Sequence, residues 1–245
     1  MTNNTLYITG AGVSAASGIP TFRGSDGYWT IGSANYTPQE MATRSMYQTN
    51  PLEFLKWYYH RFVTYRNHGP NEVHHWLADK NLVTQNIDGL DGKAGNKDYI
   101  AIHGRIDKVT EFHRQGEPVA LIDAPWEQVD ESDLDASLLS LFKIRKNSSP
   151  ELEYSLKPFV LLFDEYYTDL YGISKAEQRM FMADTIVFMG TSFSVNITQI
   201  ALNIAQQDNK PIVVVDPNPV PVYYQNAIYH QMTAAEYIDS SFTNS

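Results

Sequence analysis

The stretch YITGAGVSAASGIPTFRGSDGYW, residues 7–29, leads from a short apolar run into a turn of small residues. Gly10 and Gly12 fit the pattern G-x-G-x-x-[GA], in which glycines let backbone N–H groups approach a pyrophosphate at a helix N-terminus. In a dehydrogenase the helix would continue, and a second strand would end in an acidic residue about 20 residues further on. Here Gly18 and Pro20 end the helix early. The stretch therefore predicts phosphate binding without hydride transfer.

Short apolar runs that end in small or polar residues are typical of buried strands. These runs are TLYITG (5–10), LVTQN (82–86), YIAIHG (99–104), PFVLLFDE (158–165), TIVFMGTS (185–192) and PIVVVDPN (211–218). Helix-like patterns over 71–81, 174–184 and 197–209 lie between several of them. Strands that alternate with helices predict an α/β fold, with a Rossmann-like parallel sheet covered by helices on both faces.

Two segments fall outside this alternation. Residues 31–70 are rich in aromatic side chains and have a helical pattern, and residues 105–155 are irregular, charged and rich in serine. We expect these two insertions to form a small second module. The Rossmann-like domain would then consist of residues 1–30, 71–104 and 156–245.

Bulk composition narrows the class of protein. The chain has 245 residues, a formal net charge of −10 and no cysteine, which excludes disulfides, thiolate zinc sites and cysteine nucleophiles. Residues 123–135 hold six carboxylates and neither Lys nor Arg. Direct nucleic-acid binding needs basic patches and is not expected. No apolar run is long enough for a membrane span and the N-terminus is unlike a signal peptide, so we expect a cytoplasmic protein.

The carboxyl ends of the expected strands carry amides, hydroxyls and one histidine. In parallel α/β sheets ligands bind beyond these ends, so the sequence predicts one composite site. The residues at the ends are Thr9, Gly10, Gln85, Asn86, His103, Gly104, Asp164, Glu165, Gly190, Thr191, Ser192, Asp216, Pro217 and Asn218.

Four motifs occur in order and at suitable spacing: GAGVSAASGIPTFRG (10–24), TQNIDGL (84–90), HG (103–104) and GTSFSV (190–195). Together they resemble the sirtuin (Sir2-like) family of NAD-dependent protein deacylases. The resemblance implies that NAD is consumed rather than used as a redox carrier. The oxygen of an acyl-lysine attacks the ribose carbon that bears nicotinamide, and the products are nicotinamide and O-acyl-ADP-ribose. Acyl-lysine proteins are the implied partners.

The resemblance also assigns roles to the matching positions. His103 would be the general base that activates a ribose hydroxyl after the first step, and an imidazole with a pKa near 6.5 suits that task. Asn86 and Asp88 would lie beside nicotinamide, and Asn86 would also assist catalysis. The remaining cofactor residues implied are Gly10, Ala11, Gly12, Ser14, Phe22, Arg23, Gln85, Gly190, Thr191, Ser192, Asp216, Asn218 and Ala234. Among these, Asp216 and Asn218 are alternative candidates for the adenosine ribose.

One departure from the family pattern concerns metal. Most sirtuins have a four-cysteine structural zinc site after the catalytic His, whereas this chain has no cysteine and only scattered His and carboxylates there. We expect no zinc, and we expect the small module to be held by packing alone. The family's Phe-Gly-Glu, which pairs with the substrate backbone as an added strand, corresponds to Phe163, Asp164 and Glu165.

Tyr58 and Arg61 form a Y-x-x-R pattern, and positions three apart on a helix share one face. The pair resembles the one that binds the carboxylate of succinyl or malonyl groups in the acidic-acyl subgroup of sirtuins. An amphipathic helix with an aromatic core face and a solvated Arg would give the same pattern. Acetyl and acidic acyl substrates therefore both stay open.

A zinc-free NAD-dependent protein-lysine deacylase is the leading hypothesis. An NAD hydrolase or an ADP-ribosyltransferase on the same fold is the alternative, because the zinc module is lost and the substrate strand is altered. A non-catalytic sensor of NAD or ADP-ribose is the third, and it conflicts with the joint presence of Asn86, Asp88 and His103.

Overall fold

The computed structural model describes residues 4–21 and 36–243. Residues 4–21, 68–102 and 172–243 form one compact unit, called here the first unit, and residues 36–67 and 103–171 form the second unit. Within these described ranges, no helix is both long enough and apolar enough to cross a membrane.

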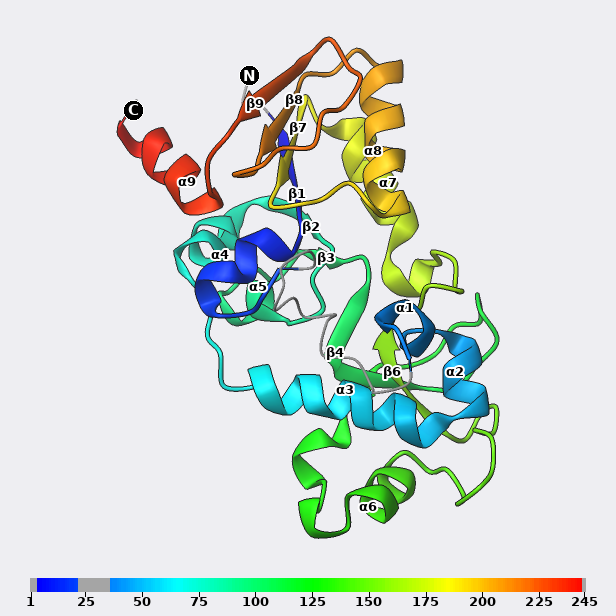
Figure 1. Cartoon of the computed structure of the whole chain (residues 1–245). Coiled ribbons are helices and arrows are strands. Elements are labelled where there is room, and N and C mark those ends of the chain that lie inside the picture. Colours follow the sequence, from blue (N-terminus) through cyan, green and yellow to red (C-terminus); the bar gives the residue numbers. More distant parts are fainter. Residues whose placement is uncertain (1–3, 22–35, 244–245) are drawn as a thin grey trace. The chain divides into compact units, whose positions relative to one another are not determined.

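The first unit is built on a parallel sheet (Figure 1). Among the described residues it has six strands in the order β3-β2-β1-β7-β8-β9, and each pair of neighbours is parallel. The strands are β1 (Thr5–Thr9), β2 (Asn81–Thr84), β3 (Ile100–Ala101), β7 (Thr185–Met189), β8 (Ile212–Val215) and β9 (Ala227–His230). From β1 the chain adds β2 and then β3 toward one edge of the sheet, and from β7 it adds β8 and then β9 toward the other edge. The order therefore reverses between β1 and β7, where doubly wound sheets bind their ligands.

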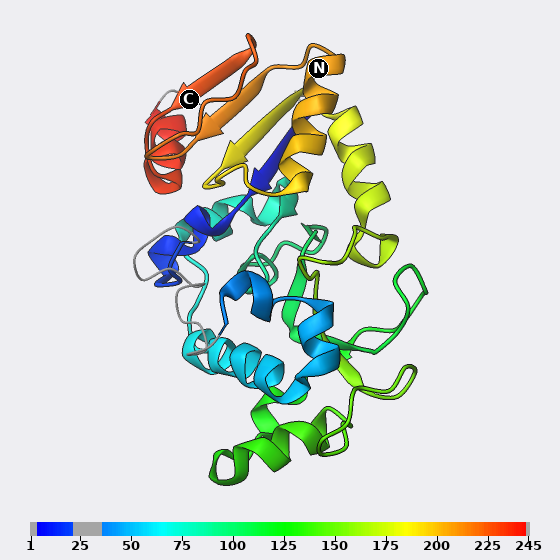
Figure 2. The same ribbon diagram turned by 45° about the vertical axis from the view of Figure 1, so that its right-hand side comes forward.

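Helices cover both faces of this sheet, which confirms the predicted α/β class. Val187, Met189 and Val215 of the sheet pack in one apolar cluster with Val73 and Ile238 from two helices on the same side. Figure 2 shows α7 and α8 on the opposite side of the sheet from α9. The helical elements are η1 (Ala11–Ser17), α4 (Glu72–Trp76), η2 (Leu77–Asp79), α5 (Leu90–Lys93), α7 (Ile173–Met182), α8 (Asn196–Gln207) and α9 (Ala234–Thr243), where η denotes a 3-10 helix.

Local sequence signals set the ends of these helices. Asn71 begins α4, because its side-chain oxygen accepts from the backbone N–H groups of Val73 and His74. Gly18 ends η1 in the left-handed conformation at φ 80°, which glycine adopts without a steric penalty. The helix after the first strand is therefore short, as the glycine and proline in the sequence predict.

The second unit combines a small antiparallel sheet with helices (Figure 1). In its described part the sheet order is β5-β4-β6, formed by β4 (Gly104–Glu111), β5 (Ile122–Asp123) and β6 (Leu156–Val160). The helical elements are α1 (Pro38–Met41), α2 (Arg44–Thr49), α3 (Pro51–Tyr65), η3 (Pro125–Gln128), η4 (Glu131–Asp133), α6 (Leu134–Leu141) and η5 (Asp169–Tyr171).

Aromatic side chains make the core of the second unit. Trp126 is 1% exposed, and its ring centroid lies 4.5 Å from that of Phe142 and 6.1 Å from those of Tyr59 and Phe62. Its indole N–H donates to the carbonyl of Ile106 at 2.7 Å, which satisfies the polar atom of a buried tryptophan. The core thus joins α3, α6 and β4 around one large ring.

The sequence analysis assigned one strand to the wrong sheet and missed another. The run 158–165, expected in the parallel sheet, contributes β6, which pairs antiparallel with β4 in the second unit. Strand β9 was not predicted, because Ile228 and Tyr229 at its centre are both exposed and the segment lacks a buried face. An apolar run indicates a buried strand but carries no information about which sheet it joins.

Candidate active site

The turns that follow β1 and β7 touch through their backbones. The N–H of Gly12 donates to the carbonyl of Gly190 at 2.9 Å, and the N–H of Gly10 donates to that of Met189 at 3.1 Å. A Cβ on Gly12 would lie 2.6 Å from the Cα of Gly190, and a Cβ on Gly10 would lie 2.7 Å from its carbonyl oxygen. Gly190 itself has φ 61°. These glycines are therefore required by the contact between the two turns, in addition to any role toward a phosphate.

Ser14 is the centre of a polar cluster beyond the end of β1. It is 1% exposed, and its hydroxyl donates to Oδ2 of Asp88 at 2.7 Å. The side-chain amide of Asn86 donates to the Ser14 hydroxyl at 3.1 Å and to the carbonyl of Gly10 at the same distance. Ser14 is thus brought next to Asn86 and Asp88, which lie 72 and 74 positions further along the chain.

A buried histidine supports this cluster from α4. His74 is fully buried, and its Nε2 lies 3.4 Å from the Ser14 hydroxyl. Its Nδ1 lies 3.2 Å from the backbone nitrogen of Asn71 and 3.0 Å from the side-chain oxygen of that residue. Asn71 therefore offers Nδ1 both a donor and an acceptor, and the ring is held in either neutral tautomer. Burial lowers the pKa of His74, against the opposing effect of the Asp88 carboxylate, and this favours a neutral imidazole.

A second acid lies close to Asp88. Asp91, in α5, is 1% exposed, and its Oδ1 has no hydrogen-bond partner. Burial, together with the negative charge of Asp88, raises the pKa of Asp91 to about 7, against a hydrogen bond from Thr84 that lowers it. Asp88 itself is held by the N–H of Leu90, which donates to its Oδ1 at 2.9 Å. Asp91 therefore changes its charge near neutral pH beneath the cluster.

The turns after β2 and β7 are also linked. The amide nitrogen of Gln85 donates to the hydroxyl of Thr191 at 3.1 Å, and Thr191 is 6% exposed. Beneath them the hydroxyl of Thr9 donates to that of Thr84 at 2.9 Å. Ser192 is half-buried and shares a 2.7 Å hydrogen bond with the hydroxyl of Ser194. Gln85 and Thr191 are thus positioned together at the carboxyl ends of β2 and β7, two strands that lie on either side of β1.

The residues expected near adenosine lie at and beyond the end of β8. Asp216 is half-buried and Asn218 is exposed. The N–H of Asn218 donates to Oδ1 of Asp216 at 2.8 Å, so one carboxylate oxygen already holds the turn. Ala234 begins α9, and its methyl group belongs to the apolar cluster on the sheet.

His103 lies in the turn between β3 and β4 and belongs to the second unit. Its Nε2 lies 3.0 Å from the hydroxyl of Tyr167, and the two rings stack at 17° with centroids 5.9 Å apart. Its carbonyl accepts from the N–H of Leu161 at 3.0 Å. The next residue, Gly104, has φ 82°, and a Cβ there would lie 2.1 Å from the carbonyl oxygen of Phe159. The histidine is therefore held at both its backbone and its ring.

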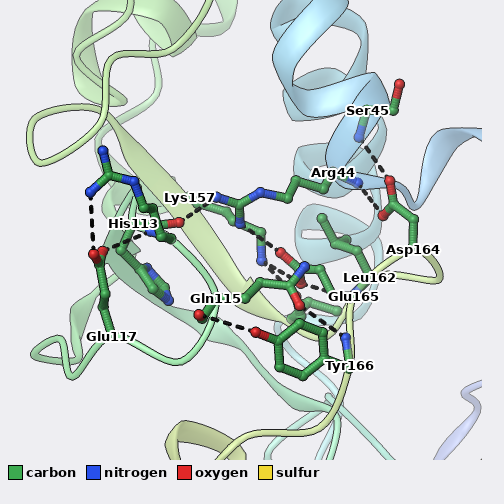
Figure 3. A network of polar contacts seen from close by, with 12 residues as sticks. Arg44, Ser45, His113, Gln115, Glu117, Lys157, Leu162, Asp164, Glu165 and Tyr166 are labelled. Carbon is green, nitrogen blue, oxygen red and sulfur yellow. Dashed lines mark hydrogen bonds and ion pairs between the residues drawn. The ribbon is translucent and has the colours of Figure 1, made fainter.

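The acidic side chains of the segment 163–165 are engaged within the second unit (Figure 3). Asp164 accepts from the backbone N–H groups of Arg44 and Ser45, at 2.6 and 3.0 Å, at the start of α2. Glu165 pairs with Arg44 at 3.0 Å and with Lys157 at 3.1 Å. Neither side chain follows a strand of the parallel sheet, so the two do not belong to the set of strand ends at which the sequence analysis put them.

Phe163 is the exposed member of the same segment. Phe163 is 49% exposed, and its backbone N–H donates to the carbonyl of Ala42 at 2.9 Å. The N–H of this residue is therefore already used within the unit. A substrate strand would have to pair with other backbone groups of the segment.

Tyr58 and Arg61 lie on one face of α3, and both are buried, at 0% and 2% exposed. The guanidinium of Arg61 lies 3.3 Å from the ring centroid of Trp57, and one of its N–H groups donates to the Trp57 carbonyl at 3.0 Å. The alternative of a solvated Arg is therefore wrong. Burial of a guanidinium is costly, and it marks Arg61 as a candidate for binding an anion.

The remaining expectations on the site concern Phe22, Arg23 and metal. Phe22 and Arg23 lie outside the described residues. Within the described ranges, no group of three or more His, Cys, Asp or Glu side chains could hold a metal ion. Lys157, Glu165 and Arg44 form a charged network inside the second unit, so that unit is not held by packing alone.

Sequence reasoning missed four residues of these clusters: His74, Asp91, Lys157 and Tyr167. A signal existed for Asp91, because it follows Asp88 by three residues and so shares its turn of chain. The others are recognised only by partners that are distant in sequence. His74 is 60 positions from Ser14, and Tyr167 is 64 positions from His103.

Comparisons with known proteins agree with this geometry. A sequence model described as "Sir2 family" matches residues 10–197. "NAD-dependent protein deacylase 1" of Caldanaerobacter subterraneus subsp. tengcongensis is 30% identical over 246 residues, covering 96% of this chain and 91% of the relative. "NAD-dependent protein deacylase 1" of Archaeoglobus fulgidus is 31% identical over 227 residues, covering 89% and 82%.

Solved structures show the same fold. A mutant Sir2 homologue in complex with ADP-ribose has a TM-score of 0.72 and 27% identity, covering 98% of this chain and 90% of that chain. A Sir2 homologue in complex with NAD has a TM-score of 0.72 and 27% identity, covering 99% and 90%.

Proposed function

The chain belongs to the Sir2 family, and we propose that it removes acyl groups from lysine side chains of proteins while consuming NAD. It is an NAD-dependent protein deacylase, as are its curated relatives by name. When bound, NAD supplies a glycosidic bond whose ribose carbon accepts the acyl oxygen, with nicotinamide as the leaving group. The residues of this chain must then bind the dinucleotide, orient the acyl-lysine and move one proton.

The observation that carries this proposal is the cluster of Ser14, Asn86 and Asp88. Its donors and acceptors are a hydroxyl, an amide and a carboxylate, which suit the hydroxyls of a ribose and the carboxamide of nicotinamide. The residues present therefore fit the cofactor. We assign Asn86 and Asp88 to the nicotinamide side, where orientation of the reacting bond matters most, with Gln85 toward the adjoining ribose.

The paired turns supply the proposed phosphate contacts. Gly10, Ala11 and Gly12 begin η1, and Gly190, Thr191 and Ser192 follow β7. Backbone N–H groups and small hydroxyls at this switch point of the sheet suit a diphosphate. Asp216 is the better candidate for the adenosine ribose, because it keeps a carboxylate oxygen beyond the one that Asn218 occupies.

We assign the proton transfer to His103 in the second unit. A neutral imidazole accepts a proton from a ribose hydroxyl after nicotinamide has left, and a base of this kind contributes about 10²- to 10⁴-fold in rate. The segment 163–165 would present its backbone to the substrate as an added strand. Its acidic side chains are engaged in the unit and would act only by holding that backbone.

We further propose that the acyl group is acidic. The support is the burial of Arg61 on the same helix face as Tyr58, because a buried guanidinium with a neighbouring phenol suits a succinyl or malonyl carboxylate. A structural role for Arg61 against Trp57 is the competing explanation. If Arg61 binds the acyl carboxylate, its replacement should affect succinyl substrates far more than acetyl substrates. If Arg61 is structural, its replacement should affect both substrates equally.

The sequence supports three further proposals about partners and location. The net charge of −10 argues against direct nucleic-acid binding. The absence of cysteine supports a protein without structural zinc, which metal analysis of the purified protein would test. A cytoplasmic location stays a prediction of the sequence.

One experiment tests the function. The purified protein is incubated with NAD and with acetyl- or succinyl-lysine peptides, and nicotinamide, peptide and ADP-ribose products are followed by mass. We expect nicotinamide release that depends on the peptide, together with O-acyl-ADP-ribose. Cleavage of NAD at the same rate without peptide would instead indicate an NAD hydrolase, and transfer of ADP-ribose to protein would indicate an ADP-ribosyltransferase.

A further inference from the structure

The ring of His103 is held by a tyrosine that the motifs do not include. The hydroxyl of Tyr167 lies 3.0 Å from Nε2, and the two rings are nearly parallel at 17°. Tyr167 is half-buried and lies in the loop between β6 and η5. Because a hydroxyl both donates and accepts, this contact is a hydrogen bond whichever ring nitrogen carries the proton.

The loop that carries Tyr167 is anchored upstream of the contact. The Glu165 side chain is 3% exposed and pairs with Lys157, and its carboxylate also accepts from the N–H of Leu162 at 3.1 Å. The N–H of Tyr166 donates to the side-chain oxygen of Gln115 at 3.1 Å, as Figure 3 shows. The Tyr167 hydroxyl is therefore placed by a held backbone rather than by a flexible loop.

The backbone of His103 is tied to the same segment. Its carbonyl accepts from the N–H of Leu161 at 3.0 Å, and Gly104 packs against the carbonyl of Phe159. With both backbones held, the 3.0 Å contact fixes the rotation of the imidazole about its side-chain bonds.

We propose that Tyr167 is a positioning residue for the proton transfer by His103, holding the ring through Nε2 so that a single orientation of the imidazole faces the substrate. This inference rests on the proposed role of His103 as general base. A base that rotates is competent for only part of the time, and a small misplacement of a reacting group is costly in rate. Tyr167 needs no contact with substrate for this role.

The test uses Tyr167→Phe, which keeps the ring and removes the hydroxyl, with Tyr166→Phe as its matched control. The Tyr166 side chain is also hydrogen-bonded through its hydroxyl, to the carbonyl of Gln115 at 3.2 Å, and is 60% exposed. Both proteins are labelled with ¹⁵N-histidine, and the side-chain nitrogen signals of His103 are identified by their loss in His103→Ala. We expect Tyr167→Phe to shift the Nε2 signal of His103, because that nitrogen loses its hydrogen bond, and Tyr166→Phe to leave it unchanged.

Kinetics separate the two chemical stages. Exchange of labelled nicotinamide into NAD in the presence of acyl peptide reports the first stage, and loss of the acyl group from the peptide reports the complete reaction. We expect Tyr167→Phe to slow deacylation roughly tenfold at saturating substrates while exchange stays within about twofold of wild type. An unchanged or faster deacylation, or His103 signals identical to wild type, would overturn the inference.

The same measurements distinguish a failure of the general-base role of His103 from a failure of the positioning role of Tyr167. If His103→Ala leaves deacylation intact, the general-base assignment fails, whatever Tyr167 does. If His103→Ala abolishes deacylation but Tyr167→Phe matches Tyr166→Phe in every readout, only the positioning role fails. If Tyr167→Phe slows both nicotinamide exchange and deacylation and lowers the melting temperature, Tyr167 has a structural role. In that case Tyr167→His, whose ring can form a hydrogen bond in place of the hydroxyl, should not restore deacylation.

Discussion

Lys157 and Glu165 form a buried ion pair, with Nζ and Oε2 3.1 Å apart and side chains 2% and 3% exposed. Lys157 also donates to the carbonyl of Val160 at 2.9 Å, and Arg44 reaches Glu165 from α2 and donates to the carbonyl of His113. Burial lowers the pKa of Lys157, and the Glu165 carboxylate opposes that effect. The pair links β6 to the loop that follows it.

Removing one partner of this pair should destabilise the protein. Lys157→Met leaves Glu165 buried with less compensation, and we expect a loss of about 3 kcal/mol or more in the free energy of unfolding, measured by denaturant titration. The control is Lys56→Met, which breaks the partly exposed pair with Asp135 and should cost less than about 1 kcal/mol. Equal losses in the two variants would show that the buried pair contributes no more to the free energy of unfolding than the partly exposed pair.

Stability should depend on pH through Asp91. Its pKa is about 7 in the folded protein and 3.8 in the reference state, so the folded state binds more protons between these values. The free energy of unfolding therefore falls as pH rises from about 4 to 7, then stays low. Asp91→Asn should remove this fall and add up to about 4 kcal/mol at pH 8, with little effect near pH 4. A variant with the same pH profile as wild type would contradict the assignment.

The contact between the two glycine turns should not tolerate a methyl group. In Gly12→Ala the new Cβ would lie 2.6 Å from the Cα of Gly190, so the turns must move apart. We expect a loss of about 1 to 3 kcal/mol in stability and weaker NAD binding, measured by calorimetry. Gly69→Ala is the control, because no atom lies within 4 Å of a Cβ there. Full NAD affinity in Gly12→Ala would mean that the turn adapts.

The general-base role of His103 predicts a split between the two chemical stages. His103→Ala should lower deacylation by about 10²-fold or more and leave nicotinamide exchange measurable, since the base acts after nicotinamide departs. His75→Ala, an exposed histidine of α4, should match wild type in both assays. Near-normal deacylation by His103→Ala would refute the role.

The acyl preference should depend on Arg61. Arg61→Met should lower kcat/KM for a succinyl peptide by at least about tenfold more than for an acetyl peptide, because only the former has a carboxylate to pair. Arg61→Lys, which keeps the charge and loses the planar fork, should be intermediate. The control is Arg66→Met. Arg66 directly follows α3 and forms a partly exposed pair with Glu127, and its replacement should leave kcat/KM unchanged for both peptides. Equal losses on both peptides would favour the structural role against Trp57.

Much of the first unit could be predicted because its signals are local. Apolar runs of strand length and the glycines at 10, 12 and 18 depend on neighbours in sequence. The site residues Ser14, Asn86 and Asp88 follow from motifs and from the rule that parallel strands end at one edge of a sheet. The assignment of the run 158–165 to the parallel sheet failed because its apolar pattern suits a parallel or an antiparallel partner equally.

By itself the sequence determined the α/β class, the chemistry of the strand ends and the absence of thiolate chemistry, since composition and short-range pattern suffice for these. The tertiary structure alone decided that Arg61 is buried, that Asp91 titrates near neutral pH and that Tyr167 holds His103. Burial, and with it desolvation and the pairing of polar groups, depends on partners distant along the chain. No local sequence pattern indicates which of those partners lie beside a given residue in the fold.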